Sequence, residues 1–233
     1  MLTIIIPVYN SKPFIRRCLD SIPDADGIEV IVVDDGSTDG SAAICERYPF
    51  AVLHTPHHGV AHARNTGIEA AHGDRLTFLD SDDEYLPGAV EAMLSDSAHR
   101  LVQYNHMIAK GCDRYPRMTS RAGVYTLDHR PRAWWGVWNK VFARDVIGGV
   151  RFEDGLQYGE DAIFALRCIM RAGAFYHSET ATVLKHTDNR RSLTRTVSPE
   201  MHMAYRRELD RLLDRADPES RRIMEKAIGE LNI

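Results

Sequence analysis

Three aspartates lie close together near the middle of the chain. Residues 78–83 read Phe-Leu-Asp-Ser-Asp-Asp, so three carboxylates follow an apolar run within four positions. Like charges at this spacing repel and raise one another's pKa, so a positive charge is needed beside them. Ligands that are all oxygen suit a hard divalent cation such as Mg²⁺ or Mn²⁺, which keeps open positions for substrate phosphates. Asp80, Asp82 and Asp83 are therefore candidate metal ligands. The alternative is a turn and helix cap, which would need only one acid.

Two upstream runs have the same construction. Residues 2–6 and residues 29–33 are rich in Ile and Val without alternation, which indicates strands buried on both faces in a parallel sheet. The side chains that follow these runs are those of Pro7, Tyr9, Asn10, Asp34 and Asp35. In open α/β sheets, ligands bind at the carboxyl edge of the strands. We therefore expect all these strand ends to meet at one site.

The first hundred residues alternate between strand and helix patterns. Strands are expected at 2–8, 29–34, 50–54 and 75–80, and helices at 12–22, 39–47, 60–72 and 87–95. This βαβα order predicts an α/β protein with a doubly wound, mostly parallel, Rossmann-like sheet. The order changes after residue 99. There we expect a strand at 101–108, a loop over 110–133 with a short strand at 123–127, helices near 133–144 and 160–172, and strands near 174–177 and 181–186.

Six short segments together resemble the successive motifs of family 2 glycosyltransferases. They are Ile-Pro-Val-Tyr-Asn at 6–10, Val-Asp-Asp-Gly-Ser-Thr-Asp at 33–39, Ala-Arg-Asn-Thr-Gly at 63–67, the run at 78–83, Trp-Asn-Lys at 138–140 and Gly-Glu-Asp at 159–161. The match covers about residues 1–195. The resemblance implies a GT-A fold, a nucleotide-sugar donor, a divalent metal and inversion at the anomeric carbon. With the change of pattern after residue 99, we expect a donor-binding half over 1–98 and an acceptor-binding, catalytic half over 99–195 as a smaller lobe. The amphipathic pattern of the tail predicts a helical extension over 196–233.

Nucleotide recognition is expected at the first two strand ends. Tyr9 offers a stacking face for the base, and Pro7 stiffens the strand end that carries it. Asp35 is expected to accept the N3–H of uracil, which favours a UDP-sugar, with Asp34 supporting the loop. Ordinary packing and turn formation are the alternative for Tyr9 and Asn10.

Basic and imidazole side chains are expected around the phosphates. Arg64 is predicted to bind the donor diphosphate or the acidic cluster, and a structural ion pair to Asp34 or Asp80 is the alternative. His186 is a candidate fourth metal ligand, although a lone His after a strand is often structural. Arg190 and Arg191 are candidates to offset charge on the leaving phosphates. Ser81, between two of the acids, completes the predicted donor site.

Asp161 is the candidate general base. Sugar transfer to a hydroxyl needs a base to remove its proton, and in a single displacement that base lies across the sugar from the leaving diphosphate. Residues 159–161 open the amphipathic helix predicted at 160–172, far in sequence from the metal acids. A helix N-terminus favours the charged carboxylate and so lowers basicity, which burial or nearby acids would have to offset. The alternative is that Glu160 and Asp161 only complement the helix dipole.

Composition is that of an ordinary soluble protein. The chain has 233 residues, 27% of them charged, with a net charge of −4, which gives no general attraction to nucleic acid or to anionic membranes. Its four cysteines have no CxxC spacing, and no apolar stretch approaches the roughly 20 residues that span a bilayer. We expect a cytoplasmic protein without an integral membrane segment. Two amphipathic helices after Pro199 are expected to pack on the domain, and peripheral contact with the inner face of a membrane is the alternative.

The expected partners are a UDP-sugar and a carbohydrate or lipid-linked acceptor, in surface polysaccharide or glycolipid assembly. A nucleotidyltransferase is one alternative, but it usually needs a glycine-rich phosphate loop after the first strand, and residues 7–14 contain no glycine. A non-catalytic module that binds nucleotide sugars is another. A nucleic-acid acceptor is the least favoured.

Overall fold

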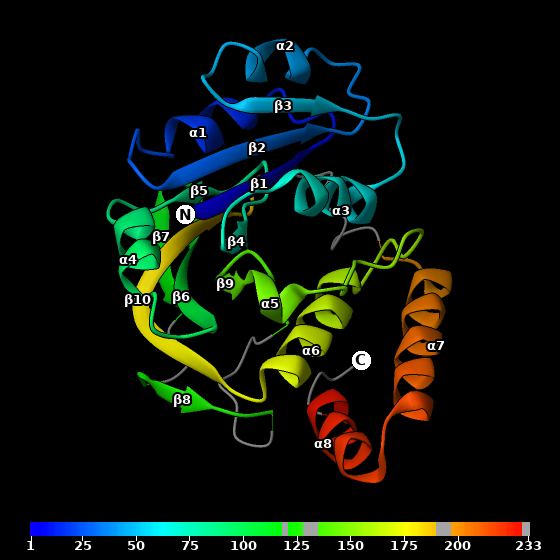
Figure 1. Cartoon of the computed structure of the whole chain (residues 1–233). Helices are drawn as coiled ribbons and strands as arrows, with labels where there is room; N and C mark the ends of the chain where they lie inside the picture. The colour runs from blue at the N-terminus through cyan, green and yellow to red at the C-terminus, as the bar shows by residue number, and fades with distance from the viewer. Residues whose placement is uncertain (118–120, 128–134, 190–196, 230–233) are drawn as a thin grey trace.

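The structure is a computed structural model, and it describes residues 1–117, 121–127, 135–189 and 197–229. One continuous sheet runs through it in the order β3-β2-β1-β4-β9-β6-β10-β5 (Figure 1). Helices cover both faces of this sheet. The predicted α/β class with a mostly parallel, doubly wound sheet is confirmed.

The amino-terminal part of the sheet is parallel. Its strands are β1 (Leu2–Val8), β2 (Ile28–Asp34), β3 (Ala51–His54) and β4 (Arg75–Phe78), and β1 pairs with both β2 and β4. The helices between them are α1 (Ile15–Asp20), α2 (Ser41–Cys45) and α3 (Val60–Ala70). Successive residues of β1 enter different cores: Ile5 packs with α3 on one face, whereas Ile4 and Ile6 pack with α1 on the other. This two-sided burial explains why β1 reads as an unbroken apolar run.

The second half extends the same sheet with mixed strand directions. It contains β5 (Glu84–Tyr85), α4 (Ala89–Ser95), β6 (Leu101–Lys110), β7 (Asp113–Arg117), β8 (Gly123–Tyr125), β9 (Lys140–Ala143), α5 (Arg144–Ile147) and β10 (Phe175–His186). Strand β9 lies between β4 and β6 and is antiparallel to both. Strand β10 runs parallel to β6, and the short β5 closes the edge in the antiparallel direction.

Three expectations for this half are corrected. The helix expected near 133–144 is replaced over 140–143 by β9, whose four residues are too few to show a strand period. The expected loop over 110–133 contains β7, which folds back on β6 through Gly111 at φ 62°. The two strands expected near 174–177 and 181–186 form one strand, β10, with register shifts around Ala181.

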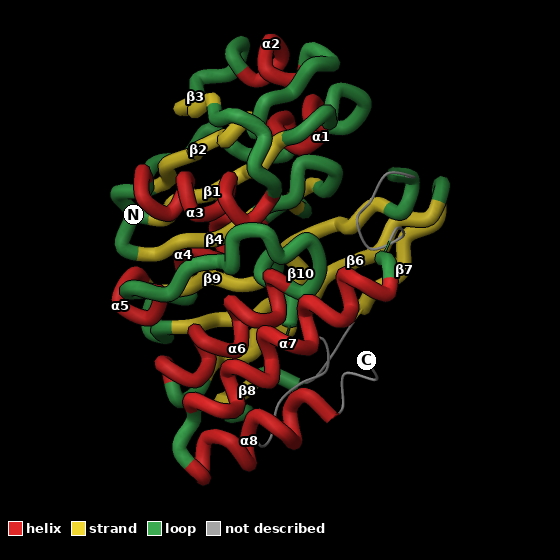
Figure 2. Tube along the Cα trace, turned by 90° about the vertical axis from the view of Figure 1, so that its right-hand side faces the viewer, coloured by secondary structure: helices red, strands yellow, loops and turns green. Residues whose placement is uncertain are grey.

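The carboxy-terminal helices pack on the domain. Helix α6 (Glu160–Ala172) lies on the face of the sheet that α3 also covers, and α7 (Pro199–Arg215) and α8 (Pro218–Gly229) follow it (Figure 2). Tyr205 and Leu209 of α7 are buried in the same core cluster as the apolar face of α6. The Ser198 hydroxyl accepts a hydrogen bond from the Met201 N–H and so caps α7. In the part of the chain that the structure describes, no helix is long and apolar enough to cross a membrane.

Candidate functional site

The aspartate trio (Asp80, Asp82 and Asp83) lies directly beyond the end of β4. The Leu79 N–H donates to the Ile5 carbonyl, which continues the β1–β4 pairing to the edge of the trio. The Asp83 N–H then donates to the Asp80 carbonyl and closes a tight turn. One carboxylate oxygen from each aspartate lies within 4.8 Å of the others. The trio therefore forms the compact oxygen cluster that the sequence predicts.

Lys185 of β10 contacts two members of this trio. Its Nζ donates to Asp83 Oδ2 at 2.7 Å and to Asp80 Oδ2 at 3.3 Å. Burial raises the pKa of Asp83 to about 7, against the opposing effect of Lys185. Burial also raises the pKa of Asp80, but Lys185 and Arg64 outweigh it and hold this pKa below its ordinary value. Asp80 is therefore charged at neutral pH, between two cations.

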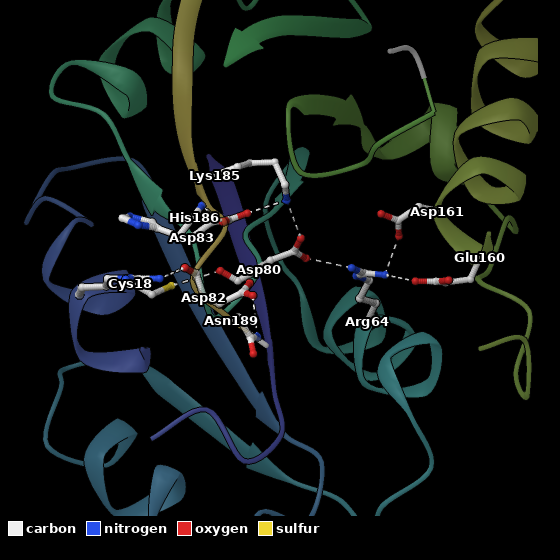
Figure 3. A network of polar contacts seen from close by, with 11 residues as sticks. Cys18, Arg64, Asp80, Asp82, Asp83, Glu160, Asp161, Lys185, His186 and Asn189 are labelled. Carbon is white, nitrogen blue, oxygen red and sulfur yellow. Dashed lines mark hydrogen bonds and ion pairs between the residues drawn. The ribbon is translucent and has the colours of Figure 1, made fainter. Parts of the chain in front are cut away.

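Arg64 of α3 connects the trio with the start of α6. Its guanidinium is buried and donates to Asp80 Oδ1 at 3.0 Å, to Glu160 Oε1 at 3.0 Å and to Asp161 Oδ1 at 2.6 Å (Figure 3). Of the two roles predicted for Arg64, the structure has the ion pair to the acidic cluster. Both terminal nitrogens of Arg64 bind carboxylates, so this side chain positions acids from two separate segments.

Asp161 lies at the start of α6 in an environment that raises the pKa of its carboxyl group. Its side chain is 23% exposed. Burial raises the pKa of Asp161 to about 7; Arg64 opposes this shift, and Glu160 and Asp80 add to it. A carboxylate with a pKa near neutrality accepts a proton more readily than an ordinary aspartate. Burial thus offsets the effect of the helix N-terminus.

Asp82 is held differently from its two neighbours. Its Oδ2 accepts a hydrogen bond from the Asn189 side-chain amide at 2.8 Å, and its carbonyl accepts one from Arg17 at 2.6 Å. Arg17, on α1, also pairs with Asp188 at 2.9 Å. These contacts attach the segment after β10 to the trio.

His186 does not place its ring in the cluster. Its backbone N–H donates to Asp83 Oδ1 at 2.9 Å, while its Nε2 contacts Glu84 Oε1 at 3.1 Å. In Figure 3 the ring lies on the far side of Asp83 from the Lys185 ammonium. Strand alternation explains the difference, because adjacent residues of β10 point to opposite faces and Lys185 takes the face of the trio. The predicted residues Arg190 and Arg191 lie outside the described residues.

The loops after β1 and β2 are bonded to each other. Asn10, at φ 48°, accepts a hydrogen bond from the Thr38 N–H at 2.8 Å, and its own N–H donates to Ser37 Oγ at 2.9 Å. Ser81 Oγ lies 2.7 Å from Ser11 Oγ, which joins the trio to the same loops. Pro7 lies in β1 two residues beyond Ile5, the last residue paired with β4, so its missing N–H leaves no gap in that ladder.

The two residues predicted to bind the nucleobase both contact His57. The rings of Tyr9 and His57 stack with centroids 3.8 Å apart. Asp35 is buried and accepts from His57 Nδ1 at 2.8 Å and from the Gly59 N–H at 2.8 Å on Oδ2. Its Oδ1 accepts from the His58 N–H and from the Thr55 hydroxyl. All four acceptor positions of this carboxylate are thus in use. Asp34 has one buried oxygen, Oδ1, without a hydrogen-bond partner in the described residues.

Three basic side chains near the site were not predicted as site residues. Lys185 contacts Asp83 and His57 contacts Asp35, and neither belongs to one of the six motifs. Lys140, in the Trp-Asn-Lys segment, is buried and donates to the Gly136 carbonyl at 2.6 Å. Burial lowers the pKa of Lys140 to about 7, although Asp161 acts in the opposite direction. The sequence feature that could have indicated a buried Lys140 is its place at the start of the apolar run Val-Phe-Ala at 141–143.

Sequence comparison with known proteins finds a glycosyltransferase family and glycosyltransferase relatives. The sequence profile described as Glycosyl transferase family 2 matches residues 3–153. The uncharacterized glycosyltransferase EpsJ of Bacillus subtilis (strain 168) is 30% identical over 200 residues, which cover 74% of this chain and 57% of EpsJ. This chain therefore spans a little over half the length of that curated relative.

Solved structures share the fold at low identity. S. aureus TarS residues 1–349, solved with UDP-GlcNAc, superposes with a TM-score of 0.83 at 23% identity, covering 98% of this chain and 70% of TarS 1–349. The mannosyltransferase PcManGT from Pyrobaculum calidifontis, solved with GDP-Man and Mn²⁺, gives a TM-score of 0.60 at 17% identity, covering 98% and 74%.

Proposed function

Because the chain belongs to glycosyl transferase family 2 and has the GT-A type of fold, we propose that it transfers a sugar from a nucleotide-sugar donor to a hydroxyl group. The favoured donor is a UDP-sugar. The favoured acceptor is a carbohydrate or lipid-linked glycan, in surface polysaccharide or glycolipid assembly. The observation that carries this proposal is the position of Arg64, which contacts an acid of the trio on one side and Asp161 on the other.

The trio fits a divalent metal. Its three oxygens approach within 4.8 Å of one another, and carboxylate oxygens are ligands that Mg²⁺ and Mn²⁺ accept. Asp80, Asp82 and Asp83 would hold the ion, which when bound neutralises charge on the leaving diphosphate. TarS was solved with UDP-GlcNAc and PcManGT with Mn²⁺, which supports this pairing of nucleotide sugar and metal. His186 is not retained as a ligand, because its ring contacts Glu84.

Asp161 would take the proton of the acceptor hydroxyl as the new glycosidic bond forms. Arg64 holds the carboxylate of Asp161 beside the trio, and Asp161 is not itself a member of the trio. Asp161 and the metal acids come from separate segments of the chain, as a single displacement requires. An attack from the face opposite the leaving group inverts the configuration of the anomeric carbon.

Nucleotide recognition would use Tyr9 and Asp35. A uracil that stacks on Tyr9 and donates its N3–H to Asp35 must replace contacts that His57 now makes with both residues. Cytosine has no N3–H and would leave the buried carboxylate with one partner fewer, at a cost of about 1–3 kcal/mol. UDP should therefore bind better than CDP.

A donor screen tests this function. The purified chain is incubated with UDP-, GDP- and dTDP-sugars in the presence of Mn²⁺, and release of the nucleoside diphosphate is measured. We expect release from a UDP-sugar that EDTA abolishes and added Mn²⁺ restores. The Asp82→Ala variant should bind UDP without turnover. Undiminished turnover in EDTA would remove the metal from the mechanism, and UDP binding without turnover of any donor would indicate a binding module.

A further inference from the structure

We propose that the Lys185 ammonium is a built-in cation of the aspartate trio, which a divalent ion must displace, and that Lys185 thereby sets the metal affinity of the site. This inference rests on the metal role proposed above. It assigns a function to a residue that contacts the trio and belongs to none of the motifs.

The contacts of Lys185 are those of a placed counter-ion. Its Nζ bonds to two different carboxylates, at 2.7 Å from Asp83 and 3.3 Å from Asp80. The same nitrogen lies 4.3 Å from the centroid of the Trp138 ring, a cation–π contact (Figure 3 shows the two carboxylate contacts). Asp83 is 1% exposed, so its charge has little access to water and depends on this ammonium.

The ammonium and a metal ion would compete for the carboxylates of Asp80 and Asp83. Mg²⁺ binds carboxylate oxygens at about 2.0–2.1 Å, and two cations cannot both approach the Oδ2 atoms of Asp80 and Asp83 closely. Arg64 does not compete in this way, because it holds the other oxygen of Asp80, Oδ1, at 3.0 Å. Metal binding therefore requires Lys185 to leave, while Arg64 can stay.

One carboxylate of the trio, that of Asp82, has no hydrogen bond or ion pair with Lys185 or Arg64 in the described residues. The Oδ2 atom of Asp82 accepts a hydrogen bond from a neutral group, the side-chain amide of Asn189, at 2.8 Å. A metal ion can therefore bind first at Asp82 and then take the oxygens that Lys185 releases. This order makes the affinity for metal depend on the strength of the Lys185 ion pairs.

Metal binding without any sugar donor tests the proposal. Lys185→Met removes the charge and keeps an unbranched side chain able to pack against Trp138. We expect Mn²⁺ titrations, followed by electron paramagnetic resonance of the free ion, to give at least about tenfold tighter binding than in the wild type. Lys185→Arg keeps the charge and should bind Mn²⁺ no more tightly than the wild type. Lys110→Met changes an exposed lysine at the end of β6 and should leave the affinity unchanged.

Thermal unfolding gives a second readout that does not depend on activity. Without metal, the Lys185→Met protein should melt at a lower temperature than the wild type, because the trio has lost its cation. Saturating Mn²⁺ should raise its melting temperature by more than it raises that of the wild type. Equal Mn²⁺ affinity in the wild type and Lys185→Met, or weaker binding in the variant, would overturn the role of Lys185 alone. Absence of Mn²⁺ binding in all of these proteins would overturn the metal site as well.

Discussion

The pKa of the Asp161 carboxyl group is set by opposing effects of its surroundings. Burial and the neighbouring acids disfavour its charge, whereas Arg64 and the N-terminus of α6 favour it. The result is a pKa of about 7, so the group is partly protonated at neutral pH. Only the deprotonated form can accept the proton of an acceptor hydroxyl. With Asp161 as the proposed base, the fraction of active enzyme should therefore fall as the pH drops below this pKa.

We expect kcat/KM for sugar transfer to decrease about tenfold per pH unit below pH 7 and to level off above it. Asp161→Asn keeps the shape of the side chain but cannot accept the proton, so it should lower the rate by about 10²–10⁴-fold. UDP affinity, measured by calorimetry, should change little. A variant with a near-normal rate would transfer the role to another acid such as Glu160.

At the residue scale, types and spacing predicted the acidic trio, Asp161 as a candidate site residue and the contact of Arg64 with the acidic cluster, but not the contacts of Lys185. The acids follow apolar runs and so stand out in the sequence. Lys185 follows Val183 and Leu184 in β10. The alternation of side chains along a strand predicts which face of the sheet Lys185 lies on, but not which residues it contacts there. Its ion pairs join residues about 100 positions apart, so they depend on the pairing of β10 with the rest of the sheet. Strand order across that distance has no local signal.

The start of α6 is the element that carries Glu160 and Asp161. Its N-cap, Gly159, adopts φ 79°, a conformation that residues with a Cβ rarely adopt. A Cβ at this position would also overlap the ring of Tyr205 on α7. Helix α7 therefore packs against the turn that precedes Asp161, so the C-terminal helices help to fix the position of this side chain.

Gly159→Ala should therefore be more harmful than its backbone strain alone predicts. Gly155 supplies the matched control, since it has φ 80° and open space around its Cβ position. We expect Gly155→Ala to cost about 1–2 kcal/mol of unfolding free energy and Gly159→Ala about 1–3 kcal/mol more. Transfer activity should fall only in Gly159→Ala. Equal losses of stability in urea unfolding would contradict a positioning role for Tyr205.

Most elements of the first half were predictable because β1, β2 and β4 are largely buried apolar runs with helical patterns between them. Strand β9 was not predictable, since its four residues are too few to show a strand period and a helix was expected near 133–144. Its place between β4 and β6 is decided by tertiary pairing. The same pairing gives the two predicted halves a single sheet without a break near residue 98.

At the scale of the whole molecule, Arg64 is a polar connection between the segment after β4 and the start of α6. It rises from α3 and contacts Asp80 after β4 and both acids at the start of α6. Three carboxylates around one buried guanidinium are stable only together, because removal of the cation leaves several negative charges in a poorly solvated space. The position of Asp161, the proposed base, relative to the trio should therefore depend on this single residue.

Arg64→Met tests this connection through stability. We expect a loss of about 3–5 kcal/mol in urea unfolding, because the buried acids lose their shared partner. Asp161→Asn in the same background should be less harmful than the sum of the single changes, with a coupling energy of about 1–3 kcal/mol, because it removes one of the charges that repel each other. The exposed pair of Arg100 and Asp145, 2.7 Å apart, provides the control, and Arg100→Met should cost at most about 1 kcal/mol. Additive effects of Arg64→Met and Asp161→Asn would mean that the two side chains do not act as one unit, and the link between metal acids and base would then have to lie elsewhere in the sheet.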